Sequence, residues 1–175
     1  MKREQSIDQI LRPLEEAPNQ AYLSNAVQVA DILEWIIDQV GECSIWQTSF
    51  SISEEFLRRL YFIKKRKDVK DIHLILDHKA TNKTLKLWVF ITKVIKETYL
   101  ADNHSKILLV EGTNGMKVSV ITSQNLTRGN RHESAFISTD SNIFERLKGE
   151  VESLIKNKSV PLHELFESKV NQNGI

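Results

Sequence analysis

The sequence predicts an α/β fold in which a mixed β-sheet carries helices on both faces. Two features of the pattern support this prediction. The first half of the chain alternates helix-spaced and strand-like apolar segments, and the second half holds short strand-like segments separated by turns. A length of 175 residues suits one domain, and no linker or internal repeat divides the chain. We therefore expect a single domain over residues 1–175.

The first helix and the first strand follow from apolar spacing. From Ser24 to Val40 the apolar residues keep helical spacing, and Gly41 follows as a stop signal. The next segment, Cys43–Ile52, is rich in β-branched and aromatic residues, which favour a strand. The pattern therefore predicts a helix that ends at Val40 and a strand directly after it.

A second helix and a buried strand follow. Ser53 can cap a helix with an acidic first turn, and this helix runs towards the basic segment Lys64–Lys67. The segment Asp71–Asp77 is apolar on both faces, which is typical of a strand covered on both sides. A strand, a helix and a strand in this order predict a βαβ unit.

The middle of the chain leaves one segment open. Residues Thr81–Ile95 fit a helix, whereas Leu87–Thr92 fits a strand equally well. Further strands are expected at Glu97–Leu100, Lys106–Glu111, Lys117–Thr122 and Ser134–Ser138. The Asn-Gly pair within Gly112–Gly115 predicts a hairpin turn between the second and the third of these strands.

A final helix is expected after these strands. Ser141 would cap it, and its apolar face would consist of Ile143, Phe144, Leu147, Val151, Leu154 and Ile155. We assign residues 141–170 to this C-terminal helical segment. Pro161 and the polar Asn171–Gly174 would mark the end of the fold.

Composition restricts the classes of function. The 24 Lys and Arg residues nearly balance the 23 Asp and Glu residues, so any nucleic-acid binding would have to use a local surface. The N-terminus lacks a signal-peptide pattern, and no apolar run reaches the length of a membrane span. We therefore expect a cytoplasmic protein with no membrane partner. Cys43 is the single cysteine and lies in an apolar run, which indicates a buried thiol.

The most specific pattern of the chain lies between residues 104 and 136. His104 and Lys106 are separated by one residue, so on a strand both side chains would point to the same face and could meet one anion. Further on come Ser123 and Asn125, and then Glu133. An imidazole, an ammonium, two hydrogen-bonding side chains and a carboxylate suit the chemistry of a phosphate ester.

These residues resemble the signature of the phospholipase D superfamily, which is His-x-Lys-x4-Asp, then Gly-Ser-x-Asn, and then a strand that bears Glu. The resemblance covers roughly Cys43–Phe136, within a motif region of residues 43–138. Glu111 stands where the family has the motif aspartate, and Thr122 stands where it has glycine. The chain also has additional residues between the two motifs, at Gly112–Gly115.

The resemblance implies a phospholipase D-like α-β-α sandwich and a metal-independent phosphodiesterase without a cofactor. His104 would attack phosphorus to form a phosphohistidine, and a second His104 would protonate the leaving oxygen. Lys106, Ser123 and Asn125 would bind the phosphoryl oxygens, and Glu133 would orient the His104 ring. Because the chain holds one copy of the motif, the resemblance implies a homodimer. Single-copy members of this size are mostly nucleases, which favours DNA or RNA as the substrate.

Some residues keep two interpretations. Glu111 either supports the end of its strand or is a solvated carboxylate before a turn. Arg128 and Arg131 lie in a loop that should rim the pocket, where they either contact nucleic acid or belong to a polar loop. His73 and His78 lack the spacing of a zinc pattern, so no metal site is expected.

The chain also fits a second class of function. A catalytically inactive module with the same fold could bind nucleic acid or mediate dimerisation. The two classes differ in whether His104, Lys106 and Glu133 of two subunits converge on one pocket.

Overall fold

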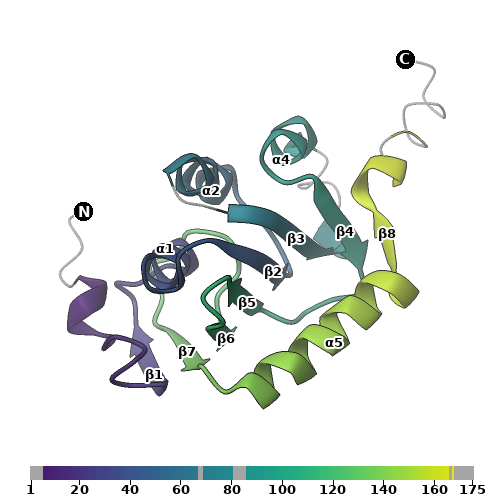
Figure 1. Ribbon diagram of the computed structural model, residues 1–175. Coiled ribbons are helices and arrows are strands. Elements are labelled where there is room, and N and C mark those ends of the chain that lie inside the picture. The colour runs from purple at the N-terminus through teal and green to yellow at the C-terminus, as the bar shows by residue number, and fades with distance from the viewer. Residues whose placement is uncertain (1–5, 67–68, 81–85, 166, 168–175) are drawn as a thin grey trace.

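The computed structural model describes residues 6–66, 69–80, 86–165 and 167. An eight-stranded sheet runs through the molecule in the order β1-β7-β6-β5-β2-β3-β4-β8 (Figure 1). Its strands are β1 (Asn19–Ser24), β2 (Cys43–Ser49), β3 (Val69–Asp77), β4 (Glu97–Ala101), β5 (Ile107–Gly112), β6 (Lys117–Thr122), β7 (Glu133–Ser138) and β8 (Ser159–Pro161). The main helices are α1 (Val29–Val40), α2 (Glu54–Arg66), α4 (Trp88–Val94) and α5 (Ser141–Lys158), with short 3-10 turns at η1 (Ile7–Gln9) and η2 (His78–Ala80).

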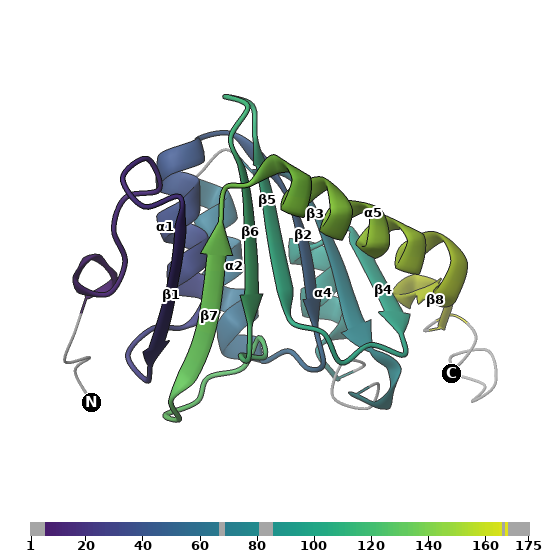
Figure 2. The ribbon, with the colours of Figure 1, turned by 90° about the horizontal axis from the view of Figure 1, so that it is seen from below.

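Helices cover both faces of the sheet. The helices α1, α2 and α4 lie on one face, and α5 crosses the other (Figures 1 and 2). The strands β2, β3 and β4 are parallel to one another, and the remaining neighbours are antiparallel. This arrangement confirms the predicted α/β class with a mixed sheet, and β2, α2 and β3 form the predicted βαβ unit.

The predicted first helix is wrong in its first part. Helix α1 begins at Val29, and Ser24 instead ends β1, where it pairs with Glu133 of β7. Strand β1 was not predicted from the sequence. Only Tyr22 and Ser24 of this strand are buried, so its pattern is weak and pairing with β7 determines its conformation.

The second helix and the strand before it match the prediction closely. Ser53 caps α2, because its Oγ accepts a hydrogen bond from the Phe56 N–H at 3.2 Å. Strand β2 ends at Ser49 rather than at Ile52. The chain leaves the sheet there, and Ile52 forms an isolated parallel bridge with Leu126.

The open segment is a helix where the structure describes it. Helix α4 covers Trp88–Val94, and residues 81–85 lie outside the described part of the chain. The Lys64 Nζ donates a hydrogen bond to the Val94 carbonyl oxygen at 3.1 Å, which joins α2 to α4. Lys67, the end of the predicted basic segment, is also outside the described residues.

Strands β5 and β6 form the predicted hairpin. Glu111 pairs with Lys117, and Gly115 in the turn has a φ of +88°, a conformation that favours glycine. Gly112 is required for a different reason. A Cβ at this position would lie 2.9 Å from Val40 Cβ, so α1 and the hairpin could not approach so closely.

Helix α5 begins where predicted but with a different capping residue. Asp140, rather than Ser141, is the N-cap. Its Oδ1 accepts hydrogen bonds from the Asn142 N–H at 2.7 Å and the Ile143 N–H at 3.2 Å. A carboxylate at this position also interacts favourably with the helix dipole.

The predicted helical segment 141–170 is interrupted by a short strand, after which residues 162–165 are helical again. Helix α5 ends at Lys158, and Ser159–Pro161 forms β8, which pairs with β4. Pro161 therefore does not end the fold but lies in an edge strand, where a missing N–H is tolerated. The predicted end at Asn171–Gly174 lies outside the described residues.

Apolar clusters fill the space on both sides of the sheet. The larger lies between the sheet and α1, α2 and α4, and the smaller lies under α5 around Trp46, Leu109 and Phe144. Cys43 is fully buried, as predicted, and burial raises the pKa of its thiol to about 11. Among the described helices, none combines the length and the apolar character needed to cross a membrane.

Candidate active site

Four strand ends meet at one edge of the sheet. Strands β2 and β6 end there, and β5 and β7 begin there (Figure 2). The segments at this edge carry the residues singled out in the sequence, namely His104, Lys106, Ser123, Asn125 and Glu133. The fold therefore gathers them at one end of the molecule.

His104 and Lys106 lie in the connection between β4 and β5. The prediction that both belong to a strand is wrong, because β5 begins at Ile107. Their side chains nevertheless meet, since Lys106 Nζ lies 3.5 Å from His104 Nδ1 and donates to the His104 carbonyl oxygen at 2.9 Å. The Lys106 carbonyl accepts from the Thr122 N–H at 3.1 Å, which holds this connection beside the end of β6. An exposed imidazole and a half-buried ammonium thus face solvent together.

Phe50 connects His104 to the end of β2, a contact that the sequence did not indicate. The two ring centroids are 5.2 Å apart. The Asn125 Oδ1 accepts hydrogen bonds from the Phe50 N–H at 3.2 Å and the Ser49 Oγ at 3.4 Å. The amide oxygen of Asn125 is therefore used within the protein, and its NH2 group is left to donate to a ligand.

Ser123 and Glu133 form a pair across β6 and β7. The Ser123 Oγ donates a hydrogen bond to Glu133 Oε2 and accepts one from the Ser134 N–H at 3.1 Å. Among the described contacts, Glu133 is not paired with the His104 ring of the same chain. The bond from Ser123 uses one of the two carboxylate oxygens, so an imidazole would bind the other oxygen or displace Ser123.

A buried polar network holds the loop of the histidine, and it was missed in the sequence. Asn103 and Asp77 are 5% and 2% exposed. The Asp77 Oδ2 accepts from the Asn103 N–H at 2.9 Å, and the Asn103 Nδ2 donates to the Ser49 carbonyl oxygen at 3.3 Å. The Asn103 Oδ1 in turn accepts from the Ser105 N–H at 3.2 Å. The sequence did contain a signal for this network. Asp77 ends a buried strand and Asn103 closely follows another, and a polar side chain that is buried at such a position needs a hydrogen-bond partner.

Glu111 lies at the opposite end of β5 from His104. Its Oε2 accepts a hydrogen bond from Lys148 Nζ at 2.7 Å, and its Oε1 lies 3.5 Å from Lys117 Nζ. The hydrogen bond from Lys148 lowers the pKa of Glu111, and the charge of Lys117 acts in the same direction. These contacts fasten the Glu111 end of β5 to β6 and α5.

Arg128 and Arg131 line clefts beside the site. The inner cleft includes Gln28, Gln124, Thr127, Arg128, Arg131 and Glu133. The outer cleft shares Gln28, Thr127 and Arg128, and adds Glu55 and Arg59. Each has a volume of about 30 Å³, well below the roughly 300–1,000 Å³ of typical small-molecule pockets. Clefts of this size suit one part of an extended ligand better than an enclosed small molecule.

One group of side chains has the composition of a metal site. Ligand atoms of Asp77, His78 and Asp102 lie within 4.8 Å of one another. The two Asp77 oxygens, however, already accept hydrogen bonds from the N–H groups of Lys79 at 2.7 Å and Asn103 at 2.9 Å. These two hydrogen bonds support the neighbouring loops and explain the position of Asp77.

Solved structures share the fold of this chain. Nuc from Salmonella typhimurium, a phospholipase D family member, has a TM-score of 0.61 at 17% identity, and the match covers 82% of this chain and 96% of that chain. NucT from Helicobacter pylori has a TM-score of 0.60 at 14% identity, covering 80% of this chain and 96% of that chain. The chain has the phospholipase D fold.

A chromatin protein also resembles this chain in structure. TrmBL2, an archaeal chromatin protein with a novel mode of DNA binding, has a TM-score of 0.55 at 11% identity, and the match covers 82% of this chain and 55% of that chain. No family model matches the sequence, and no curated protein is significantly similar to it. The resemblance noted in the sequence is thus confirmed as a shared fold, and the chemistry must be argued from the side chains at the sheet edge.

Proposed function

We propose that this chain is a cytoplasmic, metal-independent phosphodiesterase that cleaves nucleic acid as a homodimer through a phosphohistidine. The main support is the contact of the Lys106 ammonium with His104 at a sheet edge that also carries Ser123 and Glu133. An imidazole beside a fixed cation combines a nucleophile with a charge for the phosphoryl oxygens. The likeness to Nuc, a phospholipase D family member, and to the DNA-binding TrmBL2 favours nucleic acid as the substrate.

The reaction needs two imidazoles in different protonation states. A neutral nitrogen of one His104 attacks phosphorus, and the bond to the leaving oxygen breaks as the protonated second His104 gives that oxygen its proton. Water then attacks the phosphorus of the phosphohistidine, the second imidazole takes up the water proton, and the nitrogen–phosphorus bond breaks. Lys106 of each copy faces the non-bridging oxygens and supplies the positive charge.

Glu133 changes its partner in this proposal. In the single chain its carboxylate accepts a hydrogen bond from Ser123. A protonated His104 ring would displace Ser123, because a charged donor binds a carboxylate more strongly than a hydroxyl does. The freed Ser123 hydroxyl and the NH2 group of Asn125 would then donate to the phosphate.

An uncovered apolar strip supports the homodimer. Leu23, Ile121 and Phe136 are 72%, 45% and 41% exposed. Ile121 pairs with Phe136, which pairs with Ala21 two residues before Leu23, so these side chains share one face of the sheet. This is the face that α5 crosses, and α5 leaves β1 and β7 uncovered (Figure 2). A two-fold interface uses the same patch on both copies, and an apolar patch suits this arrangement.

The strip lies next to the site. Ile121 pairs with Ile107, the residue that follows Lys106. Phe136 is three residues after Glu133 on β7, so its side chain lies on the opposite face of the sheet from that of Glu133. Two strips packed around a two-fold axis would bring the two sheet edges together. Each copy would then supply one His104 and one Lys106 to a shared pocket.

A cleavage assay tests the proposal. Wild type, His104→Ala and the control His132→Ala would be incubated with single-stranded DNA and with bis-p-nitrophenyl phosphate in the presence of EDTA. His132 is exposed and belongs to the neighbouring loop, so it is a matched histidine outside the proposed chemistry. Wild type and His132→Ala should cleave, whereas His104→Ala should lose turnover and keep its circular dichroism spectrum. Wild-type turnover by His104→Ala, or activity that EDTA abolishes and magnesium restores, would refute the mechanism.

The likeness to TrmBL2 also favours the alternative of an inactive nucleic-acid-binding module. Such a module would bind single-stranded or duplex DNA with an affinity that falls as salt rises, because phosphate contacts release counterions. Binding by wild type without cleavage of either substrate would select this alternative over the enzyme.

A further inference from the structure

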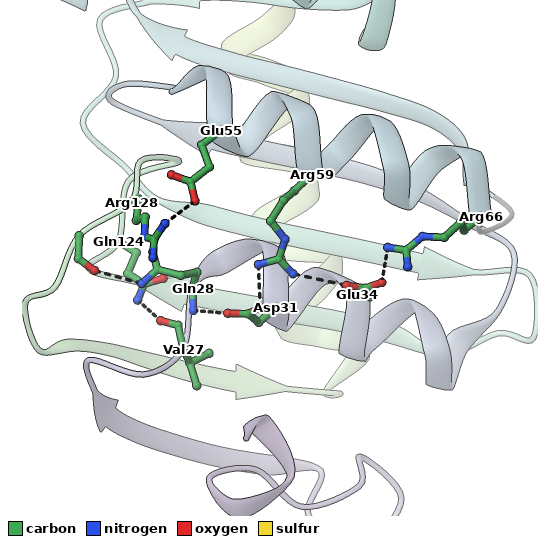
Figure 3. Close-up of polar contacts among 10 residues, drawn as sticks. Val27, Gln28, Asp31, Glu34, Glu55, Arg59, Arg66, Gln124 and Arg128 are labelled. Atoms are coloured by element: carbon green, nitrogen blue, oxygen red, sulfur yellow. Dashed lines mark hydrogen bonds and ion pairs between the residues drawn. The ribbon is translucent and has the colours of Figure 1, made fainter. Parts of the chain in front are cut away.

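Gln28 lines both the inner and the outer cleft. Figure 3 shows it at the start of α1 beside Asp31 and Arg128. The Gln28 N–H donates to Asp31 Oδ2 at 2.8 Å at the start of α1, and its Nε2 donates to the Gly129 carbonyl oxygen at 3.1 Å. The loop between β6 and β7 is therefore tied to the first turn of α1. The wall of the inner cleft is held in place from both sides.

Two arginines in these clefts have different roles. Arg59 bonds Asp31 at 2.7 Å and Glu34 at 3.4 Å, and its side chain is 32% exposed. Two carboxylates thus hold Arg59, which braces α2 against α1 (Figure 3). Among the residues that the structure describes, the ion pair of Arg128 is with Glu55 at 3.0 Å, and the two side chains are 61% and 53% exposed. Exposed pairs of this kind contribute little, so an incoming phosphate can replace Glu55 at Arg128.

Arg131 adds a second cation to the inner cleft. It is exposed, and the described part of the chain gives it no ion pair or hydrogen bond. It lines the same cleft as Arg128, and Glu133 of the candidate active site lines this cleft as well. An anion in the inner cleft would therefore meet two guanidinium groups close to the proposed reacting phosphate.

Gln124 indicates what else the ligand must carry. It lines the inner cleft and is 4% exposed, and its Nε2 donates to the Val27 carbonyl oxygen at 2.7 Å. Its Oε1 is buried and has no hydrogen-bond partner among the described residues. A buried amide oxygen requires a donor. Because this oxygen is closed to solvent, a ligand reaches it once the side chains above it move aside, and a sugar hydroxyl or the amino group of a base can then supply the donor, whereas an ionised phosphate cannot. The cleft thus suits a ligand with both an anionic group and an N–H or O–H donor.

We propose that the inner cleft binds the nucleotide that flanks the scissile phosphate in an unpaired strand. Arg128 and Arg131 bind its phosphate, and Gln124 Oε1 accepts a hydrogen bond from its base or sugar. An unpaired strand is specified because its base can turn out of the strand to reach a buried oxygen, whereas a base in a duplex is held by stacking and pairing and would have to be flipped out at a cost in free energy. The assignment of the flanking position rests on the proposed function, which places the scissile phosphate at the Glu133 end of the cleft.

Ligands of increasing length test this assignment. In the His104→Ala background, which should prevent cleavage, titration calorimetry would give Kd for a dinucleoside monophosphate and for the same compound with a terminal phosphate added at either end. One of the added phosphates should tighten binding on the order of tenfold through charge-assisted hydrogen bonds. Arg128→Ala combined with Arg131→Ala should remove this gain. The matched control is Arg146→Ala, because Arg146 also forms an exposed ion pair, with Glu150 at 3.3 Å on α5; it should keep the gain.

The outcomes separate this proposal from the proposed function. A gain that persists in the double arginine variant, or that Arg146→Ala also removes, would overturn the cleft assignment. Replacing the terminal phosphate by a complete nucleotide should tighten binding further, and no change would refute the contact with Gln124. If the gain depends on the arginines but the wild type cleaves nothing, the nuclease proposal and the flanking position fail, and the binding of a nucleotide in the inner cleft stands.

Discussion

The Lys148 ammonium donates to the Glu111 carboxylate at 2.7 Å and lies 4.3 Å from the centre of the Trp46 ring. These two contacts join α5 to the sheet at the end of β5 that lies away from His104. Glu111 therefore fastens a helix to the sheet in this chain. Its effect should be seen in stability rather than in the chemistry of the site.

Glu111→Gln should destabilise the fold in a pH-dependent way. The pKa of Glu111 is lowered in the folded state, so its stabilising effect is present above the unfolded pKa and is lost as pH falls through the folded pKa. At pH 7 the variant should lose about 0.5–1 kcal/mol of unfolding free energy, the upper range for partly exposed ion pairs. Urea unfolding at pH 7 and at lower pH would measure the difference, which should shrink below the usual carboxyl pKa of about 4.3.

A control variant makes that test sharper. Glu150→Gln removes an exposed pair with Arg146 on the surface of α5, where both side chains are at least 67% exposed. It should change stability less than Glu111→Gln does. A loss at Glu111 that stayed the same from pH 7 to pH 3 would mean that the charge pair is not its cause.

Glu133→Gln should slow turnover on the order of 10²-fold while nucleic-acid binding remains. The amide keeps the size of the side chain but removes the charge that would orient and stabilise the His104 imidazolium. Single-turnover cleavage and binding of the same oligonucleotide would be measured side by side. An equal loss of binding and turnover would instead assign Glu133 to substrate binding.

Phe136→Glu should convert the protein to a monomer without cleavage activity. The substitution places a charge in the apolar strip, where it would be buried against the second copy. Phe62→Glu is the matched control, because Phe62 is 55% exposed on α2, which covers the opposite face of the sheet. Size-exclusion chromatography with light scattering gives the oligomeric state. A dimeric and active Phe136→Glu protein would locate the interface elsewhere.

The Cys43 thiol should not react in the folded protein. It is fully buried, and burial raises its pKa to about 11, so almost no thiolate is present at pH 8. Ellman's reagent should show no reaction with native protein at pH 8 and one thiol per chain after denaturation in urea. Rapid reaction of the native protein would indicate local opening of the sheet near β2.

Strong local patterns allowed much of the fold to be predicted. Strand β6 has the predicted bounds Lys117–Thr122, and α2 begins after the predicted cap Ser53. Strands β1 and β8 could not be predicted, because β1 depends on its pairing with β7 and the three residues Ser159–Pro161 depend on β4. Such short edge strands take their conformation from neighbours that are distant in sequence.

Part of the candidate site could also be predicted from the sequence, and part could not. The five motif residues were found from their order and spacing, and the fold gathers them at one edge. The contacts of Phe50 with His104 and of Asp77 with Asn103 were not predicted. Both join segments that lie far apart in the chain, and only the three-dimensional packing of the sheet brings them together. The spacing of residues along the sequence indicates which side chains could form a site. It does not indicate the residues that hold those side chains in position.

The turn at Gly112–Gly115 lies at the end of the β5–β6 hairpin remote from His104. At the near end, the Thr122 N–H bonds the Lys106 carbonyl at 3.1 Å, which keeps the two halves of the motif together. Residues added at the far turn therefore lengthen the hairpin without moving the motif residues relative to each other. The number of residues between the two halves of the motif can therefore vary in this fold. A search for related sequences should therefore allow a gap of variable length at this turn rather than a fixed spacing. A peptide tag inserted at the turn should leave the residues at the sheet edge in place.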